Sequence, residues 1–331
     1  MTTPPEIAEA LAQAIAAAAE VRGTTSPNPA VGAAILDSAG AIVGVGATQP
    51  PGGPHAEVMA LADAGARAQG GTAVVTLEPC NHTGRTGPCS QALFDAGIQR
   101  VFYAQADPFP AAAGGAEFLA LKGVEVHFLD VKIPTLQPWL NAVKSERPNV
   151  TLKFASTLDG FAAATDGSSQ WITGAAARAF VHEDRSRRDA IIVGTGTALA
   201  DNPSLTARSG DRLYPRQPRR VVVGKREIGA GNLQRLGFEQ YPGIPEALKA
   251  LWEEGCRDVL IEGGPTLAAA ALRMDVVDNI QAYVAPALLG AGRSILNWPQ
   301  ETSISEIMRF ETSAVQQLDN DVLIEMQRKG L

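Results

Sequence analysis

The segment PHAEVMAL, residues 54–61, places a histidine and a glutamate two positions apart where a helix is expected to begin. Taken alone, His55 and Glu57 fit two interpretations. One is a pair of polar residues that cap the first turn of a helix. The other is a metal ligand beside a proton carrier. The second interpretation requires further ligands, so the fold and chemistry of the first half depend on whether the chain supplies them.

A second segment, LEPCNHTGRTGPC at residues 77–89, supplies Cys80 and Cys89 just after the next expected strand. A histidine nitrogen and two thiolates give zinc three protein ligands and leave the fourth position open for water, as a catalytic site requires. Glu57 then fits the proton carrier of the zinc nucleobase deaminases, which is not itself a ligand. His82 keeps open the alternative of a structural zinc site with four protein ligands.

Composition restricts the class of protein. At 331 residues, with 45% hydrophobic and 19% charged side chains, the chain suits two packed domains of ordinary size. A net charge of −7 argues against a general binder of nucleic acid or anionic membrane, because such proteins need a basic surface. No apolar run approaches the ~18 residues of a membrane span. The N-terminus lacks the basic start of a signal peptide, and three cysteines suit a reducing compartment, so we expect a cytoplasmic protein.

Strand-like and helix-like patterns alternate along both halves, which favours layered α/β domains. In the first half we expect strands at residues 31–36, 41–47, 72–77, 100–105 and 124–129, and helices at 55–66, 89–96 and 117–121. The second half begins with TLKFAS at 151–156, and its clearest strands are 189–194, 219–224, 258–264 and 279–285, whereas 225–245 is expected to form surface connections. A closing helix after residue 130 and the connection SERPNV predict domains at 1–146 and 147–331.

Three motifs resemble the deaminase half of the bifunctional riboflavin-biosynthesis deaminase/reductase family: PNPAVGAAI (27–35), GGPHAEVMAL (52–61) and LEPCNHTGRTGPC (77–89). The eight residues between the cysteines are the spacing found in that family. The resemblance implies a cytidine-deaminase-like three-layer fold, in which His55, Cys80 and Cys89 bind zinc and Glu57 carries the proton. It also implies that Asn28 faces the pyrimidine, the alternative being a turn former between two prolines.

Two positions depart from the family pattern. The family usually carries a histidine where GVGAT places Thr48, and it usually reads DPNP where DPFP places Phe109. Both positions are expected near the substrate pocket, so they bear on substrate contacts and on the efficiency of deamination. Neither belongs to the expected metal ligands, so zinc binding is expected to survive.

The second half lacks the G-x-G-x-x-G fingerprint of a Rossmann-type site. Two glycines between a strand and an apolar helix at residues 261–272 suit a phosphate, with a tight turn as the alternative. Five segments resemble the reductase half of the same family: LKFASTLDG (152–160), SSQWITG (168–174), GTGTALADNPSLTAR (194–208), EGGPTL (262–267) and APALLG (285–290).

This second resemblance implies a dihydrofolate-reductase-like domain that uses NADPH. The residues implied to contact NADPH are Ser156, Trp171, Thr197, Asp201, Gly264, Pro265, Thr266 and Leu267. Those expected to hold the substrate are Lys153, Ser169, Arg185, Leu205, Arg208 and Glu262. As alternatives, each arginine is a surface residue, Trp171 is a core residue and Lys153 belongs to an ordinary salt bridge. The contacts of the cofactor's 2′-phosphate stay unassigned, because Gly224 and Lys225 stand where the family often has an acidic residue.

The function implied is a two-step enzyme of riboflavin biosynthesis with Zn²⁺ and NADPH as cofactors. A phosphorylated diaminopyrimidine is deaminated by hydrolysis, and its ribosyl chain is then reduced to ribityl. Two alternatives remain open: an enzyme that is chiefly a reductase with an impaired deaminase domain, and a zinc-stabilised binding or regulatory module. We expect a small-molecule substrate, no nucleic-acid or membrane partner, and a homo-oligomer.

Overall fold

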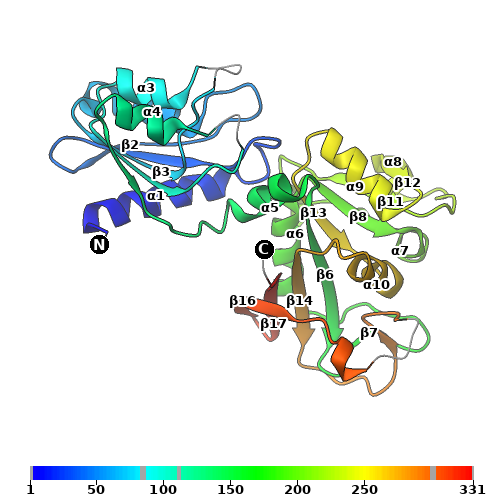
Figure 1. Ribbon diagram of the computed structural model, residues 1–331. Helices are drawn as coiled ribbons and strands as arrows, with labels where there is room; N and C mark the ends of the chain where they lie inside the picture. Colours follow the sequence, from blue (N-terminus) through cyan, green and yellow to red (C-terminus); the bar gives the residue numbers. More distant parts are fainter. Residues whose placement is uncertain (1–2, 83–86, 110–112, 299–302, 330–331) are drawn as a thin grey trace. The chain divides into compact units, whose positions relative to one another are not determined.

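The computed structural model describes residues 3–82, 87–109, 113–298 and 303–329. Residues 83–86 of the cysteine motif therefore lie outside the described part of the chain. The chain divides into two compact units, Met1–Ser145 and Glu146–Leu331 (Figure 1). Each unit mixes helices with one large sheet, which confirms the α/β class expected from the sequence.

The first unit is built on a five-stranded sheet in the order β2-β1-β3-β4-β5. Strand β1 runs antiparallel to both β2 and β3, whereas β3, β4 and β5 run parallel. The strands are β1 (Gly32–Leu36), β2 (Ile42–Ala47), β3 (Thr72–Leu77), β4 (Arg100–Gln105) and β5 (Glu125–Phe128). The helical elements are α1 (Pro5–Val21), α2 (Ala56–Ala64), η1 (Gly65–Ala68), α3 (Cys89–Asp95), α4 (Gly115–Leu121) and α5 (Gln137–Ser145).

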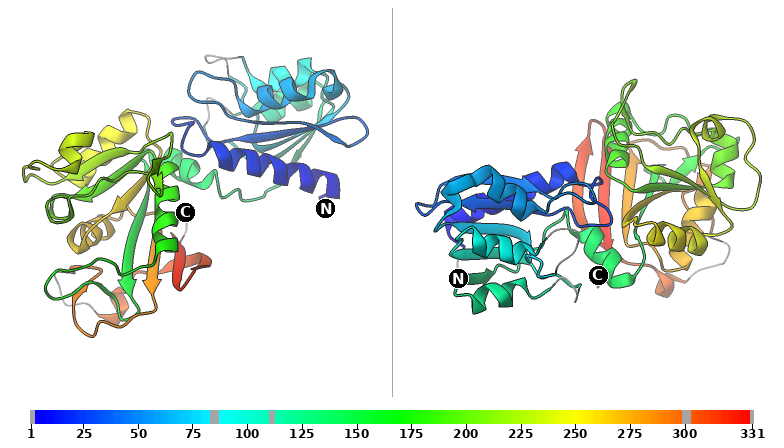
Figure 2. Two further views of the ribbon diagram at one scale, coloured as in Figure 1. Left: turned by 180° about the vertical axis from the view of Figure 1, so that it is seen from behind. Right: turned by 90° about the horizontal axis from the view of Figure 1, so that it is seen from above.

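Close approach of helix to strand fixes the layers of this unit. Helix α1 covers one face of the sheet and α3 and α4 cover the other (Figures 1 and 2). A Cβ atom at Gly32 would lie 1.8 Å from the carbonyl oxygen of Ala14 on α1, and one at Gly46 would lie 2.4 Å from the backbone nitrogen of Ala60 on α2. Glycine is therefore required at both strand positions, and the backbone of α2 is held directly on β2.

The second unit contains an eight-stranded sheet in the order β12-β11-β8-β13-β6-β14-β17-β16. All neighbouring pairs from β12 to β14 are parallel, and β17 pairs antiparallel with β14 and β16. The strands are β6 (Asn149–Thr157), β8 (Ala190–Gly194), β11 (Arg219–Val223), β12 (Glu239–Tyr241), β13 (Asp258–Glu262), β14 (Asn279–Ala285), β16 (Phe310–Leu318) and β17 (Asp321–Arg328). Two short pairs join β9 (Arg208–Ser209) to β10 (Arg212–Leu213) and β7 (Phe161–Ala163) to β15 (Arg293–Ser294).

Helices pack on both faces of this sheet. The apolar side chains of α9 (Ile244–Glu253) and α10 (Pro265–Arg273) share one core with Ile192 and Ile261. Those of α7 (Thr195–Asp201) and α8 (Asn232–Leu236) pack on the opposite side with Ile191 and Leu260, and α6 (Ala175–Ser186) packs on β14 and β17. A short η2 (Ile304–Glu306) precedes β16. Successive residues of one strand, such as Ile191 and Ile192, therefore pack into cores on opposite faces of the sheet.

Two expectations about this unit need correction or addition. Residues 225–245, expected as surface connections, contain the short helix α8 and the edge strand β12. The hairpin of β16 and β17 extends the sheet beyond the last strand expected from the sequence. Strand β16 is mostly exposed, so its sequence FETSAVQQL carries no apolar face by which to recognise it.

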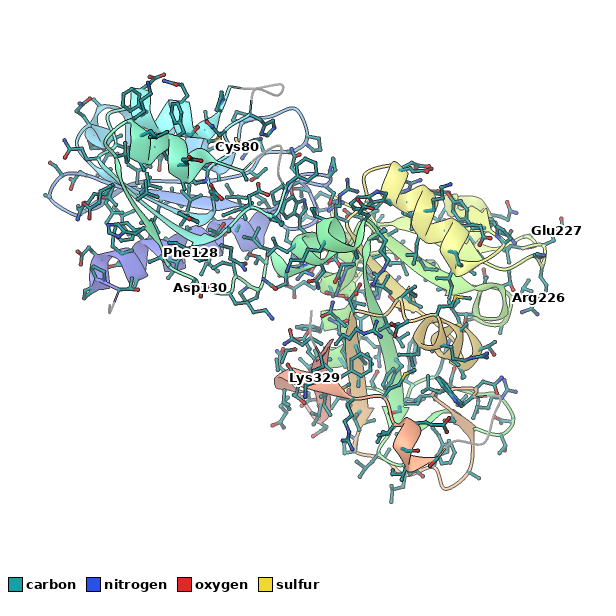
Figure 3. All side chains as sticks on the ribbon, in the orientation of Figure 1. Cys80, Phe128, Asp130, Arg226, Glu227 and Lys329 are labelled. Atoms are coloured by element: carbon teal, nitrogen blue, oxygen red, sulfur yellow. The ribbon has the colours of Figure 1, made fainter. Side chains whose placement is uncertain are left out.

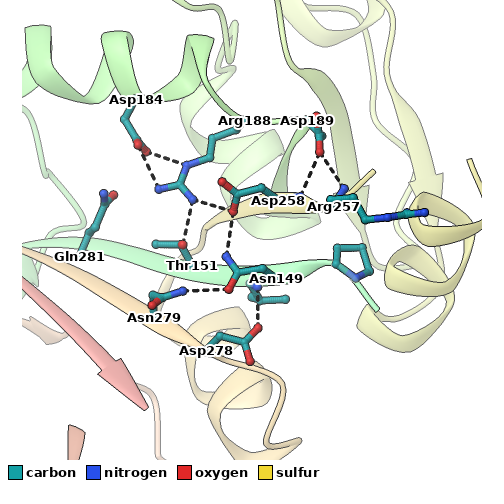
Figure 4. A network of polar contacts seen from close by, with 12 residues as sticks. Asn149, Thr151, Asp184, Arg188, Asp189, Arg257, Asp258, Asp278, Asn279 and Gln281 are labelled. Carbon is teal, nitrogen blue, oxygen red and sulfur yellow. Dashed lines mark hydrogen bonds and ion pairs between the residues drawn. The ribbon is translucent and has the colours of Figure 1, made fainter. Parts of the chain in front are cut away.

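A buried polar network holds the amino ends of three parallel strands together (Figure 4). The Arg188 guanidinium donates to Thr151 Oγ1 and to Asp258 Oδ1, both at 2.9 Å, and also to the carboxylate of Asp184. Asn149 Nδ2 donates to the same Asp258 oxygen at 2.8 Å. Charge pairs therefore occupy one end of the sheet and leave the carboxyl ends of the strands free for a site, as is usual in open α/β sheets.

Candidate functional site

Three side chains from separate elements converge in the first unit. His55 is the residue that caps α2, Cys80 follows β3, and Cys89 is the first residue of α3. The Nδ1 atom of His55 lies 3.6 Å from Cys80 Sγ and 3.3 Å from Cys89 Sγ. The ligand atoms of the three residues all lie within 4.8 Å of one another, and both cysteines are buried. The sequence motifs are thus brought together at one point.

The two sulfurs of this cluster suit a divalent cation. The hydrogen bond from Cys89 lowers the pKa of Cys80 to about 4, against the opposing effect of burial. The same contact, together with burial, raises the pKa of the Cys89 thiol. The pair therefore shares one proton, and a cation that binds both sulfurs displaces it. One nitrogen and two sulfurs form a donor set that zinc accepts with a position left for water. His82 is exposed and lies outside the cluster, so it does not provide a fourth ligand in this geometry.

Glu57 lies beside the cluster in the first turn of α2, where its side chain is 4% exposed. Burial, and then the negative charge of Cys80, raise the pKa of Glu57 to about 7. A carboxyl group with this pKa takes up and releases a proton near neutral pH, which is what general acid–base catalysis requires. The close packing of α2 on β2 at Gly46 positions both His55 and Glu57.

Thr48, Phe109 and Asn28 were expected near the substrate pocket of the deaminase region, and their surroundings differ from one another. The Thr48 side chain is buried; its Oγ1 accepts the N–H of Val31 at 3.2 Å and donates to the Val31 carbonyl at 3.4 Å. Phe109 is 50% exposed. The backbone of Asn28 forms a turn with Thr25, since its N–H donates to the Thr25 carbonyl and its carbonyl accepts from Thr25 Oγ1. The backbone of Asn28 therefore takes part in a turn, and its side chain is half-buried.

Glu78 lies within the motif LEPCNHTGRTGPC, but no role in the site was expected for it from the sequence. It lies two residues before Cys80, and its Oε1 accepts the backbone N–H groups of Gly114 at 3.1 Å and Ala116 at 3.2 Å. Its Oε2 accepts the N–H of Asp107 at 3.4 Å. This carboxylate ties the cysteine segment to the start of α4. A glutamate next to a cysteine motif carries no signal of such a role, because the partners are backbone groups of a distant loop.

The second unit contains a cavity of about 1740 Å³ at the carboxyl ends of its parallel strands. Thirteen of the fourteen residues predicted from the second half line it: Lys153, Ser169, Trp171, Arg185, Thr197, Asp201, Leu205, Arg208, Glu262, Gly264, Pro265, Thr266 and Leu267. The exception is Ser156, which is buried near the end of β6 and is outside the lining. A cavity at this edge is the usual ligand position in an open α/β sheet.

A largely buried ion pair forms the inner wall of the cavity. Arg185 Nε donates to Glu262 Oε1 at 2.6 Å and Nη2 donates to Oε2 at 2.8 Å. Burial opposes ionisation of Glu262, but the charge and hydrogen bonds of Arg185 outweigh it and hold the pKa near 2. Arg185 is therefore not the surface residue that the basic run RSRR allowed. Lys153 is half-buried, with Nζ 5.5 Å from the centre of the Tyr283 ring, and burial lowers its pKa.

Two predicted residues have unusual exposure or backbone. Trp171 is 69% exposed and lies under the guanidinium of Arg178, 4.4 Å from the ring centre, so the alternative of a core tryptophan is wrong. Leu205 is buried with a positive φ of 49°. Such a backbone is uncommon for a branched apolar residue, and strain of about 1–3 kcal/mol of this kind clusters at ligand sites.

Several further residues line the cavity without having been expected: Arg178, His182, Tyr214, Arg226, Tyr283 and Arg293. His182 Nδ1 lies 2.8 Å from the carbonyl oxygen of Thr206, and burial followed by the charge of Arg185 lowers its pKa. These residues come from single positions on helices, strands and loops. No motif connects them, so only the folded chain brings them to one surface.

The sequence matches two family models. Residues 148–324 match the RibD C-terminal domain, and residues 5–105 match the cytidine and deoxycytidylate deaminase zinc-binding region. The riboflavin biosynthesis protein RibD of Corynebacterium ammoniagenes is 57% identical over 89% of this chain and 90% of its own length. The chain belongs to the RibD family. RibD of Mycobacterium tuberculosis is 45% identical, with 97% of each chain covered.

Solved RibD structures share the whole architecture. Acinetobacter baumannii RibD is 37% identical, with a TM-score of 0.85, and the match covers 97% of this chain and 98% of that one. A diaminohydroxyphosphoribosylaminopyrimidine deaminase/5-amino-6-(5-phosphoribosylamino)uracil reductase from Thermotoga maritima is 30% identical, with a TM-score of 0.88 and coverage of 98% and 99%.

Family membership confirms the two-step function expected from the sequence. The chain is a bifunctional enzyme of riboflavin biosynthesis, with a zinc-dependent deaminase region and a reductase region that uses NADPH. A reductase with an impaired deaminase domain and a zinc-stabilised binding module are not favoured. No helix among the described residues is both long and apolar enough to cross a membrane.

Proposed function

We propose that residues 1–146 deaminate a diaminohydroxyphosphoribosylaminopyrimidine and that residues 147–331 then reduce the resulting 5-amino-6-(5-phosphoribosylamino)uracil. These are the activities named for the Thermotoga maritima relative. The observation that carries the proposal is the convergence of His55, Cys80 and Cys89 beside the buried carboxyl of Glu57. That arrangement suits the hydrolysis of an amino-pyrimidine.

In the deaminase region we assign His55, Cys80 and Cys89 as the zinc ligands and Glu57 as the catalytic residue. These three ligands would hold the zinc, which would supply a water of lowered pKa as the nucleophile for the amino-bearing carbon near neutral pH. Glu57 takes a proton from that water and delivers it to the departing amino group, which leaves as ammonia. Its buried position beside the three proposed ligands lets the same carboxyl accept and return that proton. Asn28 is proposed to contact the pyrimidine ring.

In the reductase region we assign the nucleotide to the wall formed by α7 and the start of α10. NADPH supplies the hydride for C1′ of the ribose. Gly264 precedes α10, whose first backbone N–H groups are suited to a pyrophosphate. The assigned cofactor contacts are Ser156, Trp171, Thr197, Asp201, Gly264, Pro265, Thr266 and Leu267, of which Ser156 lies outside the cavity lining.

The remaining cavity residues are proposed to hold the sugar phosphate. Arg208 is exposed, and among the described residues its Nη1 donates only to a threonine hydroxyl, at 3.2 Å, so its planar group is available for a phosphate. Lys153 is placed to donate a proton as the sugar ring opens, and burial lowers its pKa in the direction that favours donation. Arg185 and Glu262 fix the inner wall, and Ser169 and Leu205 complete the substrate set.

The partner of each site is thus a phosphorylated pyrimidine. We further propose a cytoplasmic homo-oligomer without nucleic-acid or membrane partners, in keeping with the net charge of −7 and three free cysteines.

Incubation of the zinc-loaded protein with the diaminopyrimidine, first without and then with NADPH, tests the two steps separately. Ammonia release without NADPH and a later loss of NADPH absorbance are expected. Oxidation of NADPH on the uracil compound with no ammonia release from the diamino compound would instead support the reductase-only alternative.

A further inference from the structure

One guanidinium at the rim of the reductase cavity has no role in the reaction described above. Arg226 follows β11, is exposed and lines the cavity beside α7 (Figure 3). Its Nε donates to Thr195 Oγ1 at 3.2 Å. Within the described ranges, no ion pair to a carboxylate engages this guanidinium. Its charge is therefore available to a ligand in the cavity.

The backbone around Arg226 is held in place from the neighbouring edge strand. Gln240 on β12 donates through Nε2 to the carbonyl of Gly224 at 2.7 Å and to the carbonyl of Arg226 at 2.8 Å. The side chain is anchored separately by Thr195, which is buried. Two independent contacts thus fix where the guanidinium stands, which lowers the ordering cost of binding an anion.

Gly224, two positions before Arg226, has no carboxylate that would repel a phosphate. Gly224 has a φ of +127°, and a Cβ atom there would lie 2.8 Å from Thr195 Oγ1. A side chain at this position would displace the threonine that orients Arg226. In Rossmann-type sites, which are only a chemical analogy for this cavity, a carboxylate near the ribose binds its free hydroxyl, whereas a nearby arginine accommodates a 2′-phosphate. This chain has glycine and arginine in place of the carboxylate.

A continuous wall leads from the proposed pyrophosphate position to Arg226. A Cβ atom on Gly264, before α10, would lie 3.1 Å from Thr197 Oγ1. The next residue back along the chain is Gly196, where a Cβ atom would lie 3.3 Å from Arg226 Nη2. The order along the wall is therefore Gly264, Thr197, Gly196 and Arg226. The small residues along this wall leave room for a nucleotide, and the Arg226 guanidinium lies at the end away from Gly264.

We propose that Arg226 binds the 2′-phosphate of NADPH and that this contact makes the enzyme prefer NADPH over NADH. The inference rests on the reductase function proposed above and assigns the one part of the cofactor that the sequence left unassigned. A planar guanidinium donates two parallel hydrogen bonds to a phosphate, and Thr195 holds it in the required orientation.

Equilibrium binding of NADPH and NADH, measured by isothermal titration calorimetry on the full chain, tests this contact without relying on turnover. Arg226→Gln should raise the Kd for NADPH about 10- to 100-fold at low salt, because it removes hydrogen bonds to a charged group. The Kd for NADH should change less than about twofold. Arg226→Lys, which keeps the charge but loses the fork, should give an intermediate NADPH affinity. Arg235→Gln is the matched control, since Arg235 is an exposed arginine on α8 outside the cavity lining.

The salt dependence provides a second readout. The affinity of the wild type for NADPH should fall more steeply with ionic strength than that of Arg226→Gln. Equal weakening of NADPH and NADH, or no weakening of either, overturns the assignment of Arg226 while leaving the reductase function intact. A wild type that binds neither nucleotide overturns the reductase function as well, so the two failures are distinguishable.

Discussion

Arg185 on α6 and Glu262 at the end of β13 face each other through two parallel hydrogen bonds, with side chains only 15% and 11% exposed. Removing one partner of such a pair leaves the other charge buried and uncompensated. We expect Glu262→Gln to lower the free energy of unfolding by about 3–5 kcal/mol in urea titrations. Glu253→Gln, which removes an exposed partner of Lys249, should cost under ~1 kcal/mol.

The same pair predicts a pH dependence of stability. The pKa of Glu262 is about 2 in the folded chain, below its ordinary value of 4.5. A carboxyl group whose pKa is depressed by folding stabilises the fold fully above its unfolded pKa and loses that contribution as the pH falls through the folded value. Between about pH 4.5 and about pH 2, the wild type should therefore lose more stability than Glu262→Gln. Parallel loss in both proteins across this window would contradict the assignment.

Glu57→Gln should remove the proton carrier while leaving the proposed metal ligands in place. Ammonia release from the diaminopyrimidine should fall by about 10²- to 10⁴-fold, the usual contribution of a general acid–base group. Zinc content by elemental analysis and NADPH oxidation on the uracil compound should stay at wild-type levels. A variant that keeps its deaminase rate would show that another group carries the proton.

Cys80→Ser and Cys256→Ser form a matched pair, because both cysteines are buried but only Cys80 belongs to the cluster. Zinc stoichiometry and ammonia release should be lost in Cys80→Ser and retained in Cys256→Ser, since serine is a poor substitute for a thiolate ligand. NADPH oxidation on the uracil compound should persist in both. Equal zinc content in the two variants would argue against Cys80 as a ligand.

Gly46→Ala tests whether the packing of α2 on β2 positions the catalytic glutamate. The added Cβ would lie 2.4 Å from the backbone nitrogen of Ala60 and 2.7 Å from the carbonyl oxygen of Ala56, so α2 must shift. Overpacking of this kind costs about 1–3 kcal/mol. The deaminase rate should fall with stability, whereas the reductase rate should not. Gly229→Ala, where a Cβ meets nothing within 4 Å, should change stability by under ~0.5 kcal/mol.

The sequence was most informative where chemistry restricts the choice of residue. Few side chains ligate zinc, so His55, Cys80 and Cys89 could be singled out from residue type and spacing. Residues that act through geometry alone gave no such signal. Glu78 binds backbone N–H groups of a distant loop, and Arg226 is one basic residue in a segment expected to be a plain connection.

The same limit applied to secondary structure. The strands that were predicted lie close to their observed bounds, because burial imposes the pattern that identifies them. Strands β12 and β16 lie at the two edges of their sheet, where little burial constrains the sequence. Arg185 shows the limit for single residues: its buried partner is 77 positions away, and the local sequence resembles a surface helix.

The residues of the two sites are also synthesised at different stages of translation. The proposed zinc ligands all lie within residues 55–89, in the unit that is synthesised first. The reductase cavity draws on residues from Lys153 to Leu318, nearly to the end of the chain. Because N-terminal domains generally fold first during synthesis, the proposed zinc ligands are all present in the nascent chain before most residues of the nucleotide pocket have been added. Zinc binding therefore becomes possible earlier in synthesis than NADPH binding, which needs residues close to the end of the chain.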